Sequence, residues 1–147
     1  MKAKKYVTHN EQEIKSCGTS FKGYLFATFE TLKKVFGDPS EGDGYKIYAH
    51  WEVEFEDGTV ATIYNWKNGV NYCGVEGQHL KHIVDWHIGG HSMNAEQEVK
   101  AAIRSYLDWI KNYEQCDGEC ASRHKHKDLI KLENLTICKD CFNNFKF

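Results

Sequence analysis

Regular alternation of apolar and polar residues marks a half-buried strand in the first half of the chain. Between residues 47 and 55 every second side chain is apolar, and the intervening ones are Tyr, His or Glu. A period of two directs one row of side chains to a core and the other to solvent. Asp57-Gly58 then gives a strong hairpin signal, and residues 59–67 supply the partner strand. The pattern therefore predicts an antiparallel pair.

Two further strands are predicted before and after this pair. Residues 21–27 form a short apolar run, and residues 82–88 form another. Gly89-Gly90 is expected to end the second run, because paired glycines interrupt strands. Residues 70–79 contain glycines without periodicity and are expected to form a loop.

Apolar residues at spacings of three and four predict two helices. Thr28 is placed to cap the first helix, and Gly37 is placed to end it. Asn94 is placed to cap the second helix. Its apolar stripe consists of Val99, Ala102, Ile103, Tyr106, Leu107 and Ile110. A stripe of this kind packs across a sheet, which predicts a two-layer α+β domain with an antiparallel sheet in the order β-α-β-β-β-α.

Length and composition fit one compact domain with a small appendage. The chain has 147 residues, of which 41% are hydrophobic and 14% aromatic, enough to fill a core. We expect an N-terminal arm over residues 1–19, the α+β domain over 20–112 and a separate segment over 113–147. The formal net charge of −2 provides no global attraction to nucleic acid or to an anionic membrane.

Four cysteines in the last segment have the spacing of a zinc ribbon. Cys116 and Cys120 form a C-x3-C pair, and Cys138 and Cys141 form a C-x2-C pair. Two such knuckles each offer two thiolates to one tetrahedral metal ion. A segment this small cannot bury a core of its own, so bound metal would supply its folding free energy. The sequence therefore predicts a structural Zn²⁺ site with these four ligands.

The residues between the knuckles add detail to this prediction. The pattern over 128–138 predicts a β-hairpin that brings the knuckles together, and either His124 or His126 can replace one cysteine. The alternative is two disulfides or four unrelated thiols. Disulfides require an oxidising compartment. Residues 1–20 show no signal-peptide pattern, and no apolar run reaches membrane-spanning length, so a cytoplasmic protein without a membrane partner is expected.

Three segments together resemble small proteins of bacteriophages and large DNA viruses. They are residues 51–67 (WEVEFEDGTVATIYNWK), 36–39 (FGDP) and 85–90 (DWHIGG). The resemblance covers roughly residues 20–110, and the cysteine-containing tail departs from it. It implies a viral accessory protein in the host cytoplasm, and it assigns neither an activity nor a catalytic residue.

Catalysis has candidate side chains but no known arrangement of them. His50, Glu52 and Glu54 alternate along one predicted strand, and His82, His87 and His91 lie in or near another. Such a cluster can hold a metal ion or transfer protons. Alternation alone, however, predicts a solvated face, and no HExxH, GxSxG or P-loop motif is present. We therefore expect a non-enzymatic protein with no catalytic residue.

Nucleic-acid binding is a second hypothesis. Arg123, Lys125 and Lys127 form a basic run between the knuckles, and zinc ribbons often contact nucleic acid. The element order and the Gly90-His-Ser92 run also resemble a double-stranded-RNA-binding domain. Acidic residues nevertheless follow that run, where such domains place phosphate-binding lysines.

Sequestration of a nucleotide or small anion is a third hypothesis. Gly89 and Gly90 precede a predicted helix, so their N–H groups can bind a phosphate. The same glycines can simply form a tight connection. The side chains available around such a ligand are Tyr64, Trp66, Lys67, Trp86, His87 and Ser92.

The leading hypothesis is an interaction protein. The four tryptophans, together with several tyrosines, exceed what a core of this size requires, and any that are exposed can anchor a protein partner. Residues 59–67 are apolar on both faces, so a partner or a second protomer can cover one of them. With the viral resemblance, this predicts an accessory protein that binds and modulates a host factor such as a defence component. The alternative is that the tryptophans only fill the core.

Overall fold

The protein forms two compact units, Met1–Arg104 and Ser105–Phe147. The computed structural model describes residues 3–115, 123–125, 129–132 and 135–138. The division between the units falls within the last long helix, earlier than the boundary at residue 112 that the sequence pattern predicts. Each unit is described by itself below.

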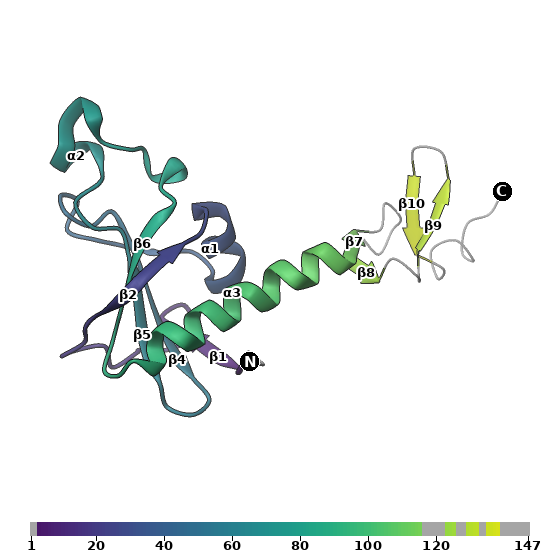
Figure 1. Ribbon diagram of the computed structural model, residues 1–147, viewed down its shortest axis with the longest axis horizontal. Helices are drawn as coiled ribbons and strands as arrows, with labels where there is room; N and C mark the ends of the chain where they lie inside the picture. The colour runs from purple at the N-terminus through teal and green to yellow at the C-terminus, as the bar shows by residue number, and fades with distance from the viewer. Residues whose placement is uncertain (1–2, 116–122, 126–128, 133–134, 139–147) are drawn as a thin grey trace. The chain divides into compact units, whose positions relative to one another are not determined.

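A six-stranded antiparallel sheet forms the centre of the first unit (Figure 1). The strand order is β1-β4-β5-β6-β2, and β3 pairs with the beginning of β4. The strands are β1 (Tyr6–Thr8), β2 (Ser20–Phe26), β3 (Ser40–Glu41), β4 (Ala49–Phe55), β5 (Val60–Tyr64) and β6 (Asp85–Gly90). The predicted α+β class and antiparallel sheet are confirmed, with the short strands β1 and β3 in addition.

Strand β1 belongs to a segment that the sequence pattern predicts to be an arm outside the domain. It pairs with β4 from Tyr6 opposite Phe55 to Thr8 opposite Val53. Thr8 is buried, and so is Ile14 farther along the segment. Residues 3–19 are therefore part of the domain. A strand of three residues is too short to produce a recognisable alternation, which explains the difference.

The described residues form three α-helices, of which α1 and α3 cover the sheet. They are α1 (Phe29–Phe36), α2 (Val70–Cys73) and α3 (Asn94–Asn112), with the 3₁₀ turns η1 (Gly74–Glu76) and η2 (Leu80–His82). The Thr28 side chain caps α1 as predicted, accepting a hydrogen bond from the Thr31 N–H at 3.0 Å. No helix within the described ranges has the length and apolar composition needed to cross a membrane.

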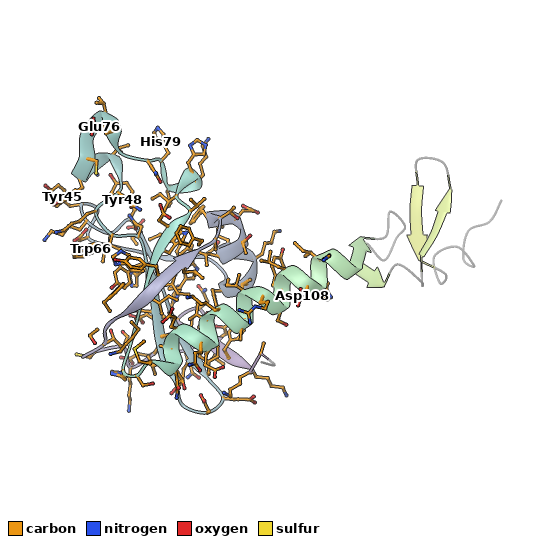
Figure 2. The ribbon with its side chains drawn as sticks, in the orientation of Figure 1. Tyr45, Tyr48, Trp66, Glu76, His79 and Asp108 are labelled. Carbon is orange, nitrogen blue, oxygen red and sulfur yellow. The ribbon has the colours of Figure 1, made fainter. Side chains whose placement is uncertain are left out.

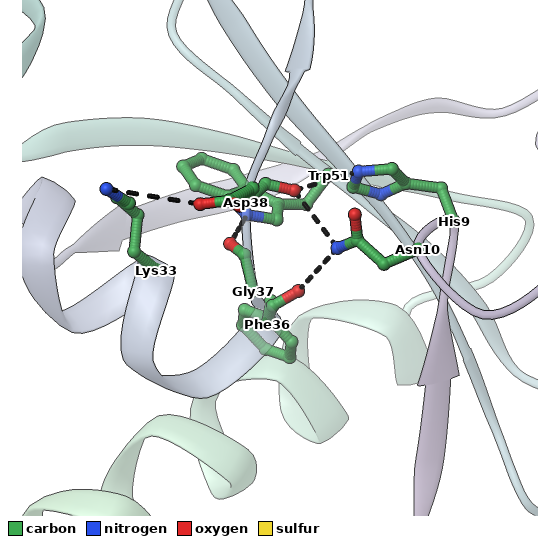
Figure 3. A network of polar contacts seen from close by, with 7 residues as sticks. All are labelled: His9, Asn10, Lys33, Phe36, Gly37, Asp38 and Trp51. Atoms are coloured by element: carbon green, nitrogen blue, oxygen red, sulfur yellow. Dashed lines mark hydrogen bonds and ion pairs between the residues drawn. The ribbon is translucent and has the colours of Figure 1, made fainter.

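Side chains from neighbouring segments bind the carbonyl groups at the end of α1 (Figure 3). Asn10 Nδ2 donates to the Phe36 carbonyl at 3.3 Å and to the Asp38 carbonyl at 3.0 Å. Trp51 Nε1 donates to the Gly37 carbonyl at 2.8 Å. A helix cannot pair its last carbonyls internally, so these bonds satisfy them and attach the segment after β1 to the helix.

The core lies between the sheet and helices α1 and α3. Trp51 and Trp86 are fully buried there, with ring centroids 5.4 Å apart in an edge-to-face arrangement. Three residues of the predicted α3 stripe join them: Val99, Ala102 and Ile103. Leu107, which lies beyond the division between the units, is 44% exposed. The predicted packing of α3 is thus confirmed for its first half.

Gly89 and Gly90 continue β6, whereas the sequence pattern predicts that they end it. Gly89 lies opposite Thr62, and Gly90 lies opposite Ala61. A Cβ atom on Gly90 would collide with the Cβ atom of Ala95 and would lie 3.0 Å from the Val60 carbonyl oxygen. The missing side chain therefore lets the first turn of α3 pack directly on the strand.

In the described parts of the second unit, four short strands form two antiparallel pairs. Strand β7 (Tyr113–Gln115) pairs with β8 (Arg123–Lys125), and β9 (Leu129–Leu132) pairs with β10 (Leu135–Cys138). The predicted hairpin between the cysteine knuckles is thus present as β9 and β10, and Cys138 is the last residue of β10. Outside the described residues lie Cys116, Cys120, His126, Lys127 and Cys141.

Candidate binding face of the sheet

The sheet of the first unit has one covered face and one open face. Along β4, Trp51 and Val53 are buried in the core, whereas His50, Glu52 and Glu54 are half-buried and point to the opposite side. The strand alternation seen in the sequence therefore distinguishes the two faces correctly. We call the side that carries the histidine and the glutamates the open face.

Strand register brings aromatic residues from separate strands together on the open face. His50 lies opposite Tyr64, Tyr64 lies opposite His87, and His87 lies opposite Tyr24. The next row contains Glu52, Thr62, Gly89 and Phe21. Directly opposed side chains on one face of a sheet are close enough to interact, and in the first row Tyr24, His87 and Tyr64 are in ring contact.

Five rings surround a shallow hollow on this face. They form what we call the aromatic platform: Phe21, Tyr24, Tyr64, Trp66 and His87, around a volume of about 300 Å³. His87 is the central ring. Its centroid lies 5.0 Å from Phe21, 5.1 Å from Tyr24, 5.6 Å from Tyr64 and 6.5 Å from Trp66. These separations are typical of aromatic pairs in contact, so the rings support one another.

The platform leaves much of its aromatic area in water. Phe21 is 48% exposed, Tyr24 is 60% exposed and Trp66 is 38% exposed. Phe26, at the end of the same strand β2, is 78% exposed. Single exposed aromatic residues are common, but a contiguous group on one face is typical of an interaction site.

Two lysines lie beside the platform at Trp66. The ammonium nitrogen of Lys67 is 5.2 Å from the Trp66 ring centroid, and that of Lys46 is 5.9 Å from it. Lys67 also lies 5.6 Å from the Tyr72 ring, which contacts Tyr45. Trp66 and Tyr45 are labelled at the left of the first unit in Figure 2. The platform is therefore bordered by positive charge at this end.

The opposite end of the open face is acidic and partly covered. Glu52 accepts a hydrogen bond from Ser16 Oγ at 2.7 Å, and Glu54 accepts one from Gln12 Nε2 at 3.2 Å. Both donors belong to the segment that follows β1. Glu52 and Glu54 therefore lie at one end of the open face, and the two lysines lie at the other.

Burial keeps the central imidazole uncharged at neutral pH. The pKa of His87 lies below its usual value of 6.5, because partial burial disfavours the imidazolium form. The pKa of His50 is also lowered, mainly by burial, and Glu52 opposes part of that effect. Burial raises the pKa of the Tyr64 hydroxyl, so this group also stays neutral. At neutral pH His87 and Tyr64 are therefore both uncharged.

Some of the predicted binding residues meet on the platform and others do not. Tyr64, Trp66 and His87 belong to it, and Lys67 borders it. Trp86 does not, because it is fully buried on the covered face, where its N–H donates to the Ala27 carbonyl at 2.9 Å. The predicted place of Trp86 beside a ligand is therefore wrong.

The predicted phosphate loop is also corrected by the structure. Gly89 and Gly90 are paired strand residues, and both are buried. Ser92 is exposed, and its carbonyl accepts the N–H of Ala95. The basic run lies in the other unit, where Arg123 and Lys125 belong to β8. The backbone groups of Gly89 and Gly90 are used in strand pairing, whereas the prediction assigns their N–H groups to a phosphate.

Sequence reasoning misses Phe21, Tyr24 and Lys46 as site residues. Phe21 and Tyr24 are three positions apart, which normally places two strand residues on opposite faces. A register shift between Phe21 and Gly23 inserts an extra residue and returns both rings to one face. The signal that could have revealed it is the glycine in the middle of an otherwise regular strand.

The described residues contain little that indicates catalysis. His50 Nε2 and Glu52 Oε1 are 4.0 Å apart, which is the closest contact within the predicted acid–base cluster. No group of three or more His, Cys, Asp or Glu side chains within the described part of the chain is arranged to hold a metal ion. No protein-family model, curated protein or solved structure matches this chain.

Proposed function

We propose that this protein is a non-enzymatic interaction protein that binds and modulates a host factor, such as a defence component, through the aromatic platform. The single observation that carries the proposal is the group of rings exposed side by side on a paired sheet. Aromatic residues held rigidly supply a large contact area at low entropic cost and dominate the energetics of binding surfaces. The resemblance to small bacteriophage and large-DNA-virus proteins supports an accessory role in the host cytoplasm.

Covering the platform would yield useful binding free energy. Burying a large apolar side chain fully is worth about 1.5–3 kcal/mol, and three of the platform rings, Phe21, Tyr24 and Trp66, are 38–60% exposed. Several such rings offer a few kcal/mol before polar contacts are added. Because the strands are already paired, a partner would not have to order the backbone first.

Affinity capture from host lysate tests the proposal. The tagged protein is compared with a Tyr24→Ala/Trp66→Ala variant and with Trp109→Ala. Trp109 is the matched control, because it is 39% exposed, against 38% for Trp66, and belongs to the second unit. We expect a stoichiometric partner with the wild type and with Trp109→Ala, and its loss with the platform variant. No stoichiometric partner, or retention by the platform variant, would overturn the proposal.

We further propose that a structural zinc ion holds the C-terminal segment through Cys116, Cys120, Cys138 and Cys141. The two-knuckle thiol spacing supports this set, and so does the β9–β10 pair that ends at Cys138. Metal content of freshly purified, reduced protein is the test. We expect one zinc per chain, lost in Cys138→Ser and retained in Cys73→Ser, which alters a free exposed cysteine. Metal-free protein with an intact tail would contradict the proposal.

A further inference from the structure

We propose that the aromatic platform stacks the unpaired bases of single-stranded nucleic acid, whose backbone phosphates lie at Lys46 and Lys67. The inference goes beyond the proposed function, because it assigns a ligand of a different class to the same surface. It differs from the sequence hypotheses, which assign nucleic acid to the basic run near residue 125 or a phosphate to Gly89 and Gly90.

The lining of the hollow is suited to planar rings. Every residue that surrounds it is aromatic, and these residues come from β2, β6 and the end of β5 with Trp66 just beyond. Each nucleobase has a π face, so stacking on such rings accepts any base. The hydroxyl groups of Tyr24 and Tyr64 and the neutral imidazole of His87 can in addition exchange hydrogen bonds with base edges.

Positive charge lies beside the ring on which a base is expected to stack. Lys46 and Lys67 both approach the Trp66 ring, so a base on Trp66 would bring its phosphate within reach of two ammonium groups. The carboxylate near Lys46 belongs to Asp43. It accepts three backbone N–H bonds, from Tyr45, Lys46 and Ile47, at 2.8, 2.8 and 3.0 Å. All three bonds go to one oxygen, Oδ1, so they hold this carboxylate against its own turn.

Carboxylates elsewhere on the open face limit where the backbone of the nucleic acid can run. Glu52 and Glu54 occupy the far end of the open face, and Asp85 lies opposite Phe26 at the β2 edge. These groups repel phosphate, so the backbone is expected to run along the Lys46–Lys67 side of the platform. With a net charge of −2 on the whole chain, attraction is local rather than global.

The lysines beside Trp66 distinguish this surface from the apolar centre of a typical protein interface. Lysine is depleted in the buried centre of protein interfaces, because its ammonium group must lose water there. Here Lys46 and Lys67 both lie beside Trp66, at one end of the platform. A nucleic-acid groove combines aromatic rings with cations, which is the combination that this surface presents.

Fluorescence anisotropy with a labelled short oligothymidylate tests the proposal on the full-length protein. We expect Trp66→Ala and Tyr24→Ala each to weaken binding about tenfold, and Trp109→Ala to leave it unchanged. Lys46→Gln with Lys67→Gln should reduce the log–log salt slope by about 1.4, since each phosphate contact to a single strand contributes about 0.7. Lys34→Gln, an exposed lysine on α1, is the control for charge. Circular dichroism confirms that each variant is folded.

The outcomes separate this inference from the proposed function. Absence of oligothymidylate binding, or binding that Lys125→Gln abolishes and the platform variants leave intact, overturns the inference. If the oligonucleotide does not bind but Trp66→Ala and Tyr24→Ala still abolish capture of a host protein, the platform is a protein-binding surface and only the inference fails. If the platform variants change neither result, both proposals fail.

Discussion

The two faces of one sheet use the same kind of residue for opposite purposes. On the covered face, Trp51 and Trp86 are fully buried, and each indole N–H donates to a carbonyl. On the open face, Trp66 is 38% exposed beside two lysines. Residues only one position apart in β5 or β6 thus belong to different environments. Fold stability depends on one row of side chains, and the other row is free to serve binding.

The largest expected effect is a difference in stability between the two tryptophan environments. Trp86→Ala should lower the free energy of unfolding by about 3–5 kcal/mol, because it opens a cavity and leaves the Ala27 carbonyl unpaired. Trp66→Ala should cost less than about 1 kcal/mol. Urea unfolding followed by circular dichroism measures both. Equal losses would show that the open face also holds the fold together.

Adjacent glycines provide a second test of the comparison. Gly90→Ala should cost about 1–3 kcal/mol, because its new methyl group meets Ala95 and the Val60 carbonyl on the covered side. Gly89→Ala should cost less, since the nearest atom is the Thr62 hydroxyl, which can rotate away on the open face. Thermal unfolding ranks the two variants. The reverse order would mean that α3 does not pack closely against β6.

The smallest expected effect concerns pH. The pKa of His87 is lowered in the folded protein, so below about pH 6.5 the unfolded chain binds more protons than the folded one. Stability should therefore be constant above about pH 7 and should decrease as the pH falls toward the folded pKa. His50 contributes in the same direction. Melting temperatures at about pH 7.5 and about pH 5.5 should differ less in His87→Phe than in the wild type. An unchanged difference would show that His87 is fully solvated.

Local patterns predict much of this fold because they depend on few residues. Strand β4 follows its alternation, and α1 follows its cap at Thr28 and its end at Gly37. Strand β1 is not predictable in this way, because it is stabilised by pairing with β4 rather than by its own pattern. The end of β6 is not predictable from its own pattern either, because it depends on the close packing of α3 against Gly90.

The binding face is predictable only in part. Alternation places Tyr64, Trp66 and His87 among the candidates but cannot show which face is left uncovered. Trp86 is excluded only by its burial under the helices. The contribution of β2 depends on the register shift near Gly23, which brings Phe21 and Tyr24 beside His87. Such juxtapositions arise from strand pairing across long sequence distances.

The indole N–H signals of the tryptophans offer the most direct test that the open face is the binding surface. Two-dimensional NMR spectra are recorded while a short oligothymidylate is titrated into the full-length protein. We predict that the Trp66 signal shifts progressively to saturation, while the buried, hydrogen-bonded signals of Trp51 and Trp86 stay in place. Saturable binding that leaves the Trp66 signal unmoved would contradict the account.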